Sequence, residues 1–287
     1  MITPRVQAAM RNLPTIRPSR GTALLCPSSA ILLLLFFFLT AFNLHAQSVR
    51  IAAASDLQFA LTDLASQYEK QSGAKLAITY GSSGNFFAQI QNGAPFDIFF
   101  SADISYPQKL IEAGFAEPDS RYTYAFGRIV LWVPSDSPIN AAQMQWKTLL
   151  DARIQKIAIA NPEHAPYGRA AVAALQKAGL YEQVKSKLVY GENISQAAQF
   201  VQSGSAQAGI LAMSLTFTPA MNSGKTWEIP RDSYPPLEQA VILLKSLPNK
   251  PAASAFLAFL RTDPARATLA RYGFTLPAAA PTREVKP

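Results

Sequence analysis

Short apolar runs alternate with helix-forming segments along most of the chain, and this alternation limits its possible folds more than any other feature. The run VRIAAAS (49–55) is typical of a buried strand. In the segment that follows, Leu57, Leu61 and Leu64 recur on one helical face, and Gly73 is the expected helix stop. Strand–helix–strand units of this kind favour a parallel sheet that is covered by helices on both faces.

The alternation continues to Phe274 and restarts once, after a Pro/Ser/Asp cluster that ends at Asp136. Strands are expected within 74–81, 96–103, 124–136, 154–160, 187–191, 206–214 and 235–245, and helices within 56–73, 85–93, 104–114, 169–180, 195–204 and 251–274. The restart predicts two α/β lobes, with the strand at 235–245 returning the chain to the first. We expect lobe 1 at 47–127 plus 240–277, lobe 2 at 128–239, and a disordered tail at 278–287.

The first 46 residues have the composition of a secretory signal peptide. Four arginines precede an apolar run of 13 residues, Ala30 to Phe42, which is shorter than the roughly 20 residues that span a bilayer. We expect cleavage after Ala46; a membrane anchor is the alternative. The lone cysteine, Cys26, lies before the apolar run, where it is badly placed for lipid attachment.

The 241 residues after Ala46 carry a small positive charge. They hold 22 basic and all 18 acidic residues, a formal net charge of +4, and the basic residues are scattered, so no nucleic-acid surface is predicted. Removing the leader also removes the cysteine and His45, which leaves His164 as the remaining histidine. This composition excludes disulfides, thiolate chemistry and Cys/His metal cages, so we predict neither a metal ion nor another cofactor.

Three loops that follow predicted strands place hydroxyl or amide side chains at a helix start. Ser55 follows the first strand, Ser82 and Ser83 follow the second, and Asn193 lies in GENISQ (191–196). Because a helix N-terminus has unpaired N–H groups and a partial positive charge, such loops favour an anion site without basic side chains. The alternative is plain helix capping, for which Ser55 and Gln58 have the spacing of a capping box.

A fourth loop, ANPEHAPYG (160–168), offers Tyr167 just before a helix, where its backbone N–H can donate into a cleft between the lobes. Glu163 and His164 in the same loop raise the question of acid/base catalysis. No nucleophile accompanies them in the sequence, and Asp56 and Asp103 are more simply a helix-start carboxylate and a strand-end residue. No catalytic residue is therefore predicted.

The motifs AAAS (52–55), GSSGNFFAQIQNGAPFDIFFSAD (81–103), ANPEHAPYG (160–168) and RYGF (271–274) resemble those of the periplasmic molybdate-binding proteins of ABC uptake systems. The resemblance extends from about Val49 to about Pro277. It implies a type II periplasmic binding protein fold, with molybdate or tungstate held in the cleft by neutral hydrogen bonds. It also implies a monomeric, periplasmic, non-enzymatic receptor that delivers its anion to a membrane permease and closes by hinges near 127–134 and 236–244.

Carried over by motif, the resemblance assigns anion binding to Ser55, Ser83, Tyr167 and Ile194, the last two mainly through backbone N–H groups. Some relatives have a tyrosine where this chain has Ala212, and Ser214 is the candidate replacement. Asp56 and Asn193 are further candidates, and we expect the Asp56 carboxylate to point away from a fully ionised molybdate.

Two alternatives remain open on the sequence. One is a receptor of the same fold for sulfate, thiosulfate or phosphate; for phosphate, the Asp56 carboxylate can accept a proton from the protonated oxyanion. The other is a secreted hydrolase, which would need a nucleophile and a base, although no G-x-S-x-G elbow is present in the chain.

Overall fold

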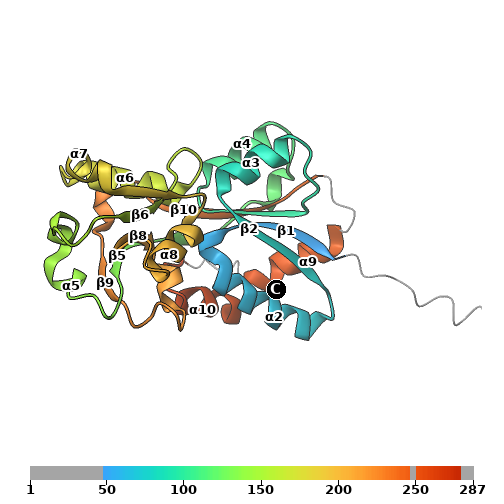
Figure 1. The fold of residues 1–287 in the computed structure, drawn as a ribbon. Coiled ribbons are helices and arrows are strands. Elements are labelled where there is room, and N and C mark those ends of the chain that lie inside the picture. The colour runs from blue at the N-terminus through green and yellow to red at the C-terminus, as the bar shows by residue number, and fades with distance from the viewer. Residues whose placement is uncertain (1–47, 246–249, 279–287) are drawn as a thin grey trace, which may run out of the picture. The chain divides into compact units, whose positions relative to one another are not determined.

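The computed structural model describes residues 48–245 and 250–278, which form two five-stranded sheets with helices packed against each (Figure 1). The predicted leader and all but one residue of the predicted tail lie outside the described residues. We use lobe 1 for the first sheet and its helices, and lobe 2 for the second sheet and its helices. In the described ranges, no helix has both the length and the apolar character needed to cross a membrane.

The sheet of lobe 1 has the strand order β2-β1-β3-β10-β4. Strand β1 pairs in parallel with β2 and β3, whereas β10 pairs antiparallel with β3 and β4. The expectation of a parallel sheet is therefore wrong for the later strands, and the sheet is mixed. The strands are β1 (Val49–Ala54), β2 (Leu76–Gly81), β3 (Ile98–Ser101), β4 (Tyr122–Gly127) and β10 (Leu237–Leu243).

Helices cover both faces of this sheet, as the sequence predicted. Side chains alternate between the faces along each strand: Phe100 packs with α2, α9 and α10, whereas Phe99 packs with α3 and α4. Tyr68 and Phe256 add an aromatic contact, with ring centroids 5.0 Å apart. The helices are α2 (Gln58–Ser72), α3 (Ser83–Gln91), α4 (Ser105–Glu112), α9 (Lys250–Leu260) and α10 (Asp263–Arg271), and a 3-10 turn, η1 (Ser55–Leu57), precedes α2.

The sheet of lobe 2 has the order β7-β6-β8-β5-β9 and is also mixed. Strand β6 pairs in parallel with β7 and β8, and β5 pairs antiparallel with β8 and β9. The sequence reading did not predict β9. The strands are β5 (Ile129–Val133), β6 (Ile157–Ala160), β7 (Leu188–Gly191), β8 (Ala208–Ala212) and β9 (Lys225–Glu228), and the helices are α5 (Ala141–Met144), α6 (Pro166–Lys177), α7 (Tyr181–Val184) and α8 (Ile194–Gln202).

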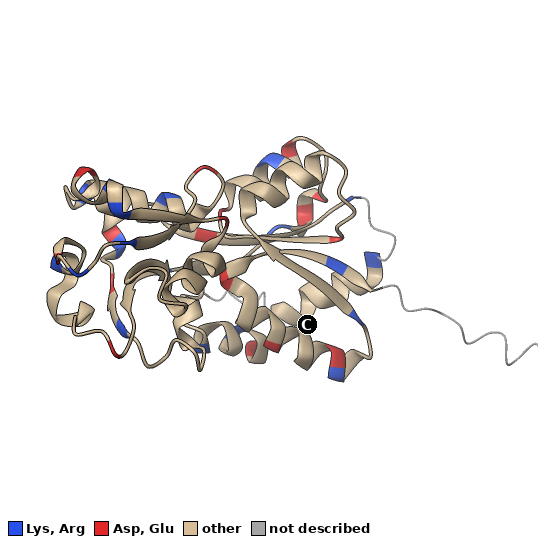
Figure 2. Ribbon diagram, in the orientation of Figure 1, with Lys and Arg blue, Asp and Glu red and all other residues tan. Residues whose placement is uncertain are grey.

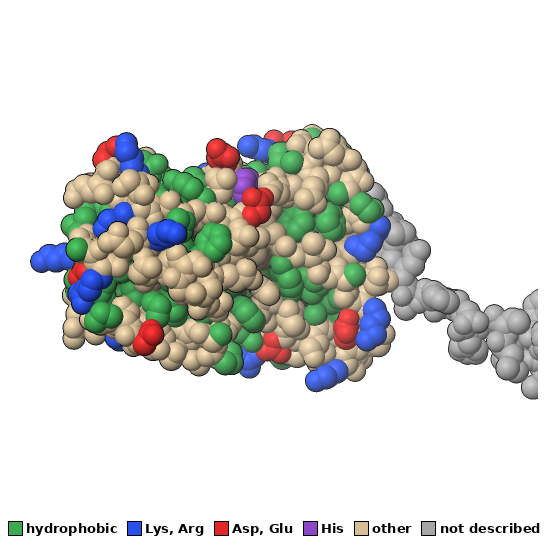
Figure 3. Space-filling model, in the orientation of Figure 1, with side chains coloured by type: hydrophobic (Ala, Val, Ile, Leu, Met, Phe, Trp, Pro, Cys, Tyr) green, Lys and Arg blue, Asp and Glu red, His purple; other side chains and the backbone are tan. Residues whose placement is uncertain are grey.

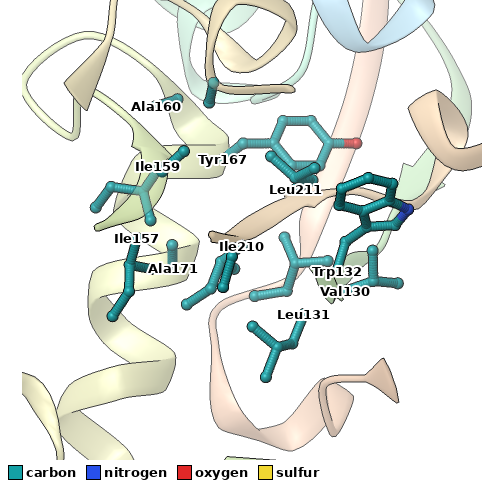
Figure 4. Close-up of a cluster of buried hydrophobic side chains, with 14 of the residues drawn as sticks. Val130, Leu131, Trp132, Ile157, Ile159, Ala160, Tyr167, Ala171, Ile210 and Leu211 are labelled. Carbon is teal, nitrogen blue, oxygen red and sulfur yellow. The ribbon is translucent and has the colours of Figure 1, made fainter. Parts of the chain in front are cut away.

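The core of lobe 2 ends at an aromatic residue that belongs to the site. Figure 4 shows Tyr167 beside Leu211, with its hydroxyl directed away from Ile157 and Ile159. Tyr167 is buried with the aliphatic side chains of β5, β6 and β8. The ring is thereby held in the apolar core while its hydroxyl is free to reach polar groups outside it.

The chain passes from lobe 1 to lobe 2 within what the sequence suggested was one long strand. The segment 124–136 is divided into β4 and β5, which belong to different sheets and are separated by Arg128. The Arg128 guanidinium donates to the Gly273 carbonyl at 2.8 Å and approaches Glu228 at 3.2 Å. Strand β10 then returns the chain to the first sheet, as predicted.

Candidate functional site

The four predicted loops meet around one small cavity. It is lined by Ser55 and Asp56 of η1, Ser82 and Ser83 at the start of α3, Ala165 to Tyr167 at the start of α6, and Ile194 at the start of α8. Ala54, Gly81 and Ala102 complete the lining, which includes no lysine, arginine or histidine from the described ranges 48–245 and 250–278. Five of the seven predicted residues therefore line the cavity: Ser55, Asp56, Ser83, Tyr167 and Ile194.

The hydroxyl oxygens of Ser55 and Ser83 each accept a hydrogen bond from a backbone N–H group. The Ser83 hydroxyl accepts from the Ala102 N–H at 3.0 Å, and the Ser55 hydroxyl accepts from the Ser195 N–H at 3.4 Å. Since a hydroxyl has one hydrogen to donate as well as lone pairs to accept, each serine keeps its hydrogen for another acceptor. Two buried hydroxyl hydrogens are thus available to an anion in the cavity.

The helix caps are made by other residues. Ser82 is the N-cap of α3 and accepts from the Asn85 N–H, and Asn193 is the N-cap of α8 and accepts from the N–H groups of Ser195 and Gln196. No side-chain cap hydrogen bond is made at the start of η1 or α2, so the capping-box interpretation of Ser55 and Gln58 is wrong. Ser83 is already inside the helix, which frees it from a capping role.

Helix starts surround the cavity with backbone donors. Helices α3, α6 and α8 begin at the cavity, and the N–H groups of a first helical turn have no partner within their helix. Pro166, which has no N–H, occupies the first position of α6, so the first donor of that helix belongs to Tyr167. Ile194 is the first residue of α8. These positions fit backbone donation to an anion.

A buried hydrogen-bond network lies beside the cavity. Asp56 Oδ2 accepts from the Tyr167 hydroxyl at 2.9 Å and from Gln239 Nε2 at 2.7 Å. The Tyr124 hydroxyl donates to Gln239 Oε1 at 2.7 Å, which fixes the amide so that its nitrogen faces Asp56. Sequence reasoning missed Gln239 and Tyr124, although a glutamine in the middle of the apolar strand LEQAVIL was an available signal.

Burial shifts the acid–base behaviour of this network. Removal from water raises the pKa of Asp56 to about 6, against the opposing effect of hydrogen bonds from Gln239, Tyr167 and the backbone N–H groups of Asp56 and Leu57. Burial, together with the charge of Asp56, also raises the pKa of Tyr167 and of Tyr124 well above the usual tyrosine value. Both tyrosines therefore remain hydrogen-bond donors at neutral pH.

Ala212 occupies the position where some relatives have a tyrosine, and Ser214 is the candidate replacement. Ala212 is buried at the end of β8. The Ser214 hydroxyl donates to the Asp56 backbone carbonyl at 2.7 Å, and Ser214 does not line the cavity. In this arrangement its hydrogen is already used, and Ser214 positions Asp56.

Further contacts join the two lobes at the rim of the cavity. The Ser82 hydroxyl lies 2.9 Å from His164 Nδ1, and the Gly84 N–H donates to the His164 carbonyl at 2.9 Å. Asn85 donates to Glu192, and Arg169 pairs with Asp103 at 2.6 Å. These contacts hold α3 and the end of β3 in lobe 1 against the loops of lobe 2.

Ser82, His164 and Glu192 contact one another in the sequence hydroxyl, imidazole and carboxylate, as in a hydrolytic triad. Glu192 lies 3.6 Å from His164 Nε2. The contact between Ser82 and His164 spans the two lobes, whereas His164 and Glu192 both lie in lobe 2. The enclosed cavity has a volume of about 10 Å³, near the minimum that holds one water molecule. Of these three residues only Ser82 lines the cavity, and its contact with His164 joins the two lobes at the rim.

The same volume also bears on an oxyanion ligand. A tetrahedral anion, with four oxygen atoms around a central atom, is larger than one water molecule, so the loops must separate to admit it. Outside the cavity, charges of both signs are dispersed. Lys and Arg are spread over both lobes in Figure 2, and the face shown in Figure 3 has no broad basic patch.

The chain is similar to known proteins over the whole region that contains these loops. The family described as bacterial extracellular solute-binding protein matches residues 49–275. The molybdate-binding protein ModA of Azotobacter vinelandii is 39% identical over 81% of this chain and 91% of its own length. ModA of Rhodobacter capsulatus is 38% identical over 80% of this chain and 88% of its own length.

Structural similarity extends over the same region. The solved structure of the Azotobacter vinelandii periplasmic molybdate-binding protein superposes with a TM-score of 0.76 at 35% identity, covering 80% of this chain and all of that one. The family resemblance and the two-lobed fold that the motifs predicted are thereby confirmed. This chain belongs to the bacterial extracellular solute-binding proteins, in the family that contains the molybdate-binding proteins ModA.

Proposed function

We propose that this protein binds molybdate, and also tungstate, between its two lobes and passes the anion to a membrane permease. The observation that carries the proposal is the lining of the cavity, which offers hydroxyl and helix N-terminal donors but no basic side chain. The identity to two molybdate-binding proteins supports the choice of anion. A cavity that is rich in hydrogen-bond donors and has no basic side chain in its described lining recognises an oxyanion by the geometry of its hydrogen bonds.

Four residues would hold the anion in this proposal. Ser55 and Ser83 would donate from their hydroxyl groups, whose acceptor sides are already used by backbone N–H groups. Tyr167 and Ile194 would donate from backbone N–H groups in the first turns of α6 and α8. Asn193 would act on the anion indirectly, because its side chain caps α8 and holds that helix start in place.

The proposal is tested by adding molybdate, tungstate, sulfate, thiosulfate and phosphate separately to the purified protein. An anion at 100 times its dissociation constant should stabilise the folded state by about 2.7 kcal/mol, measured as a rise in melting temperature. Equilibrium dialysis gives the affinities. Melting is preferred to tryptophan fluorescence as the readout because Trp132, Trp146 and Trp227 all belong to lobe 2 and none lines the cavity.

Stabilisation by sulfate, thiosulfate or phosphate, with none by molybdate or tungstate, would show that the protein is a receptor for a different anion. Stabilisation by no anion would remove the anion-binding proposal altogether. The relatives that match this chain are binding proteins, so turnover of ester substrates is not expected. If turnover occurred and were lost in His164→Ala, a hydrolytic function would have to be considered instead.

The proposed function places the protein in the periplasm as a monomer, exported by residues 1–46 and cleaved after Ala46. Closure would occur at the two connections between the lobes, near 127–134 and 236–244. The proposed bounds are 47–127 plus 240–277 for lobe 1 and 128–239 for lobe 2, although residues 237–239 of β10 already pair with β4 in the sheet of lobe 1. N-terminal sequencing of protein recovered from the periplasm of an expressing host tests the cleavage site, and gel filtration with light scattering tests the monomer.

A further inference from the structure

Asp56 is an acidic residue in the lining of a cavity that is proposed to hold an anion. Its residue is 1% exposed, and no basic side chain lines the cavity to offset its charge. An ionised carboxylate there would repel a dianion at close range, and this repulsion is strong because little water is present to screen it. The position therefore needs a physical explanation beyond helix capping.

The two carboxyl oxygens of Asp56 have different surroundings. Oδ2 accepts two hydrogen bonds, from the Tyr167 hydroxyl and from Gln239 Nε2. Oδ1 is buried, and no group in the described part of the chain forms a hydrogen bond with it. A buried polar atom without a partner is costly, and a few such atoms in a folded protein mark sites where a further group is expected.

The directions of the neighbouring hydrogen bonds decide where a proton on this carboxyl would lie. Tyr124 donates to Gln239 Oε1, and Gln239 Nε2 and the Tyr167 hydroxyl both donate to Asp56 Oδ2, so the side-chain donors that reach this carboxyl are directed at Oδ2. A proton on Asp56 must therefore be on Oδ1. In this position Asp56 becomes a neutral donor, of the same kind as Ser55 and Ser83.

We propose that Asp56 takes up one proton from solvent when the oxyanion binds and donates a hydrogen bond from Oδ1 to an oxygen of the anion. This inference rests on the proposed function and names a further residue that determines its specificity. The groups that face the carboxyl are Tyr167 from α6, Gln239 from β10 and, through Gln239, Tyr124 from β4. The backbone N–H groups of Asp56 and Leu57 also act on the carboxyl and favour its ionised form. At the rim, Asp103 and Arg169 are paired with each other.

The acid–base behaviour of Asp56 fits this assignment. Because burial raises the pKa of Asp56 to about 6, the group is mostly ionised at pH 8 before the anion binds and can be protonated at little cost nearer pH 6. Because binding requires this proton, the affinity for the anion should fall by up to about tenfold for each pH unit above 6.5. Below pH 6 the carboxyl is already protonated, and the affinity should become independent of pH.

The test measures molybdate binding calorimetrically between pH 6 and 8.5, in pairs of buffers that differ in ionisation enthalpy. The wild-type protein should take up about one proton per anion near pH 8. Asp56→Asn supplies a permanent donor without charge, so it should show no linked proton uptake and should bind at least about tenfold more tightly than wild type at pH 8. Asp63→Asn, on the surface of α2 and paired with Arg271, is the matched control and should behave as wild type.

Three results would overturn the inference. The first is a wild-type affinity that does not change with pH and is accompanied by no proton uptake, a measurement that needs no variant. The second is the same pH dependence in Asp56→Asn as in wild type, which would assign the proton to the anion or to another group. The third is weaker binding by Asp56→Asn at pH 8, which would make the ionised Asp56 an acceptor for a protonated anion. In each of these cases molybdate still binds, whereas an absence of binding at every pH would instead overturn the proposed function.

Discussion

Asp56 links the stability of the fold to pH through a charge that is removed from water on folding. Its pKa is raised from 3.8 to about 6, so the folded protein holds this proton more tightly than the unfolded chain. The resulting stabilisation is fully present below about pH 4 and is lost as the pH rises through about 6. Above pH 6 the folded protein holds a buried carboxylate with one oxygen that has no partner among the described residues.

Asp56→Asn should therefore stabilise the anion-free protein at high pH. At pH 8 the free energy of unfolding should rise by up to roughly 3 kcal/mol, because the buried charge is removed, whereas at pH 4 it should change little. Urea unfolding at the two pH values measures both. An equal loss of stability at pH 4 and pH 8 would show that the hydrogen-bond network needs both oxygens of the carboxyl group, whatever its charge.

Ser83→Ala tests the donor that we consider central to the anion site. The change removes a hydroxyl that accepts from the Ala102 N–H, so the protein should lose about 1 to 3 kcal/mol of stability and bind molybdate at least about tenfold more weakly. Melting and equilibrium dialysis measure the two effects. Ser66→Ala, on the exposed face of α2, is the control. Lost stability with full affinity would limit Ser83 to holding Ala102.

At this scale the sequence predicted the residues that lie at helix starts and missed those that lie within strands. Ser55, Ser83 and Ile194 line the cavity. They could be predicted because a local sequence pattern indicates where a helix starts. Gln239 meets Asp56 across 183 positions of the chain, and no local pattern carries that information. The same reason explains why the contact between Ser82 and His164 was not predicted.

At the scale of elements, the start of α3 packs against the loop that follows β6 so closely that only a glycine fits. A Cβ atom on Gly84 would lie 2.5 Å from the His164 carbonyl oxygen and 2.9 Å from both His164 Cα and the Tyr106 hydroxyl. The backbone hydrogen bond from Gly84 to His164 depends on this close approach.

Gly84→Ala should therefore separate stability from binding. Alanine favours the helix by about 0.5 to 1 kcal/mol over glycine, so the anion-free protein should keep or gain stability in its open form. Molybdate affinity should fall at least about tenfold because the closed form is obstructed. Gly204→Ala, which introduces strain at a positive φ angle with no atom within 4 Å, should lose stability and keep its affinity. Unchanged affinity in Gly84→Ala would show that α3 and the loop need not touch in the bound state.

Strand direction and strand membership were the limits of prediction at this scale. The apolar runs indicated most strands correctly, but a run of buried residues looks the same whether its neighbours are parallel or antiparallel. The segment 124–136 shows the limit for strand membership. It is apolar along most of its length, so the sequence did not indicate that it is divided between two sheets at Arg128. Strand β9 was missed because KTWE has little apolar character, although it pairs with β5 over four residues.

At the scale of the whole molecule, the two lobes must change their separation for the anion to pass. The cavity holds about 10 Å³ in this arrangement, and polar contacts between the lobes surround it. We predict that small-angle X-ray scattering of the wild-type protein will give a smaller radius of gyration with saturating molybdate than without. Gly84→Ala should show little or no decrease. An identical radius with and without molybdate in the wild type would mean that the anion enters without a change in lobe separation.

The division of one extended stretch between two sheets leaves a single residue, Arg128, as the connection between β4 and β5. Strands β4 and β5 are each paired within their own sheet, so in the proposed closure the torsion angles of Arg128 and its neighbours would govern the movement of one lobe relative to the other at this crossing. Arg128 is also tethered to Gly273 in lobe 1 and to Glu228 in lobe 2, and no residue of the tether lines the cavity. If the proposed function holds, a substitution in this tether would alter how readily the lobes part while leaving the residues proposed to contact the anion unchanged.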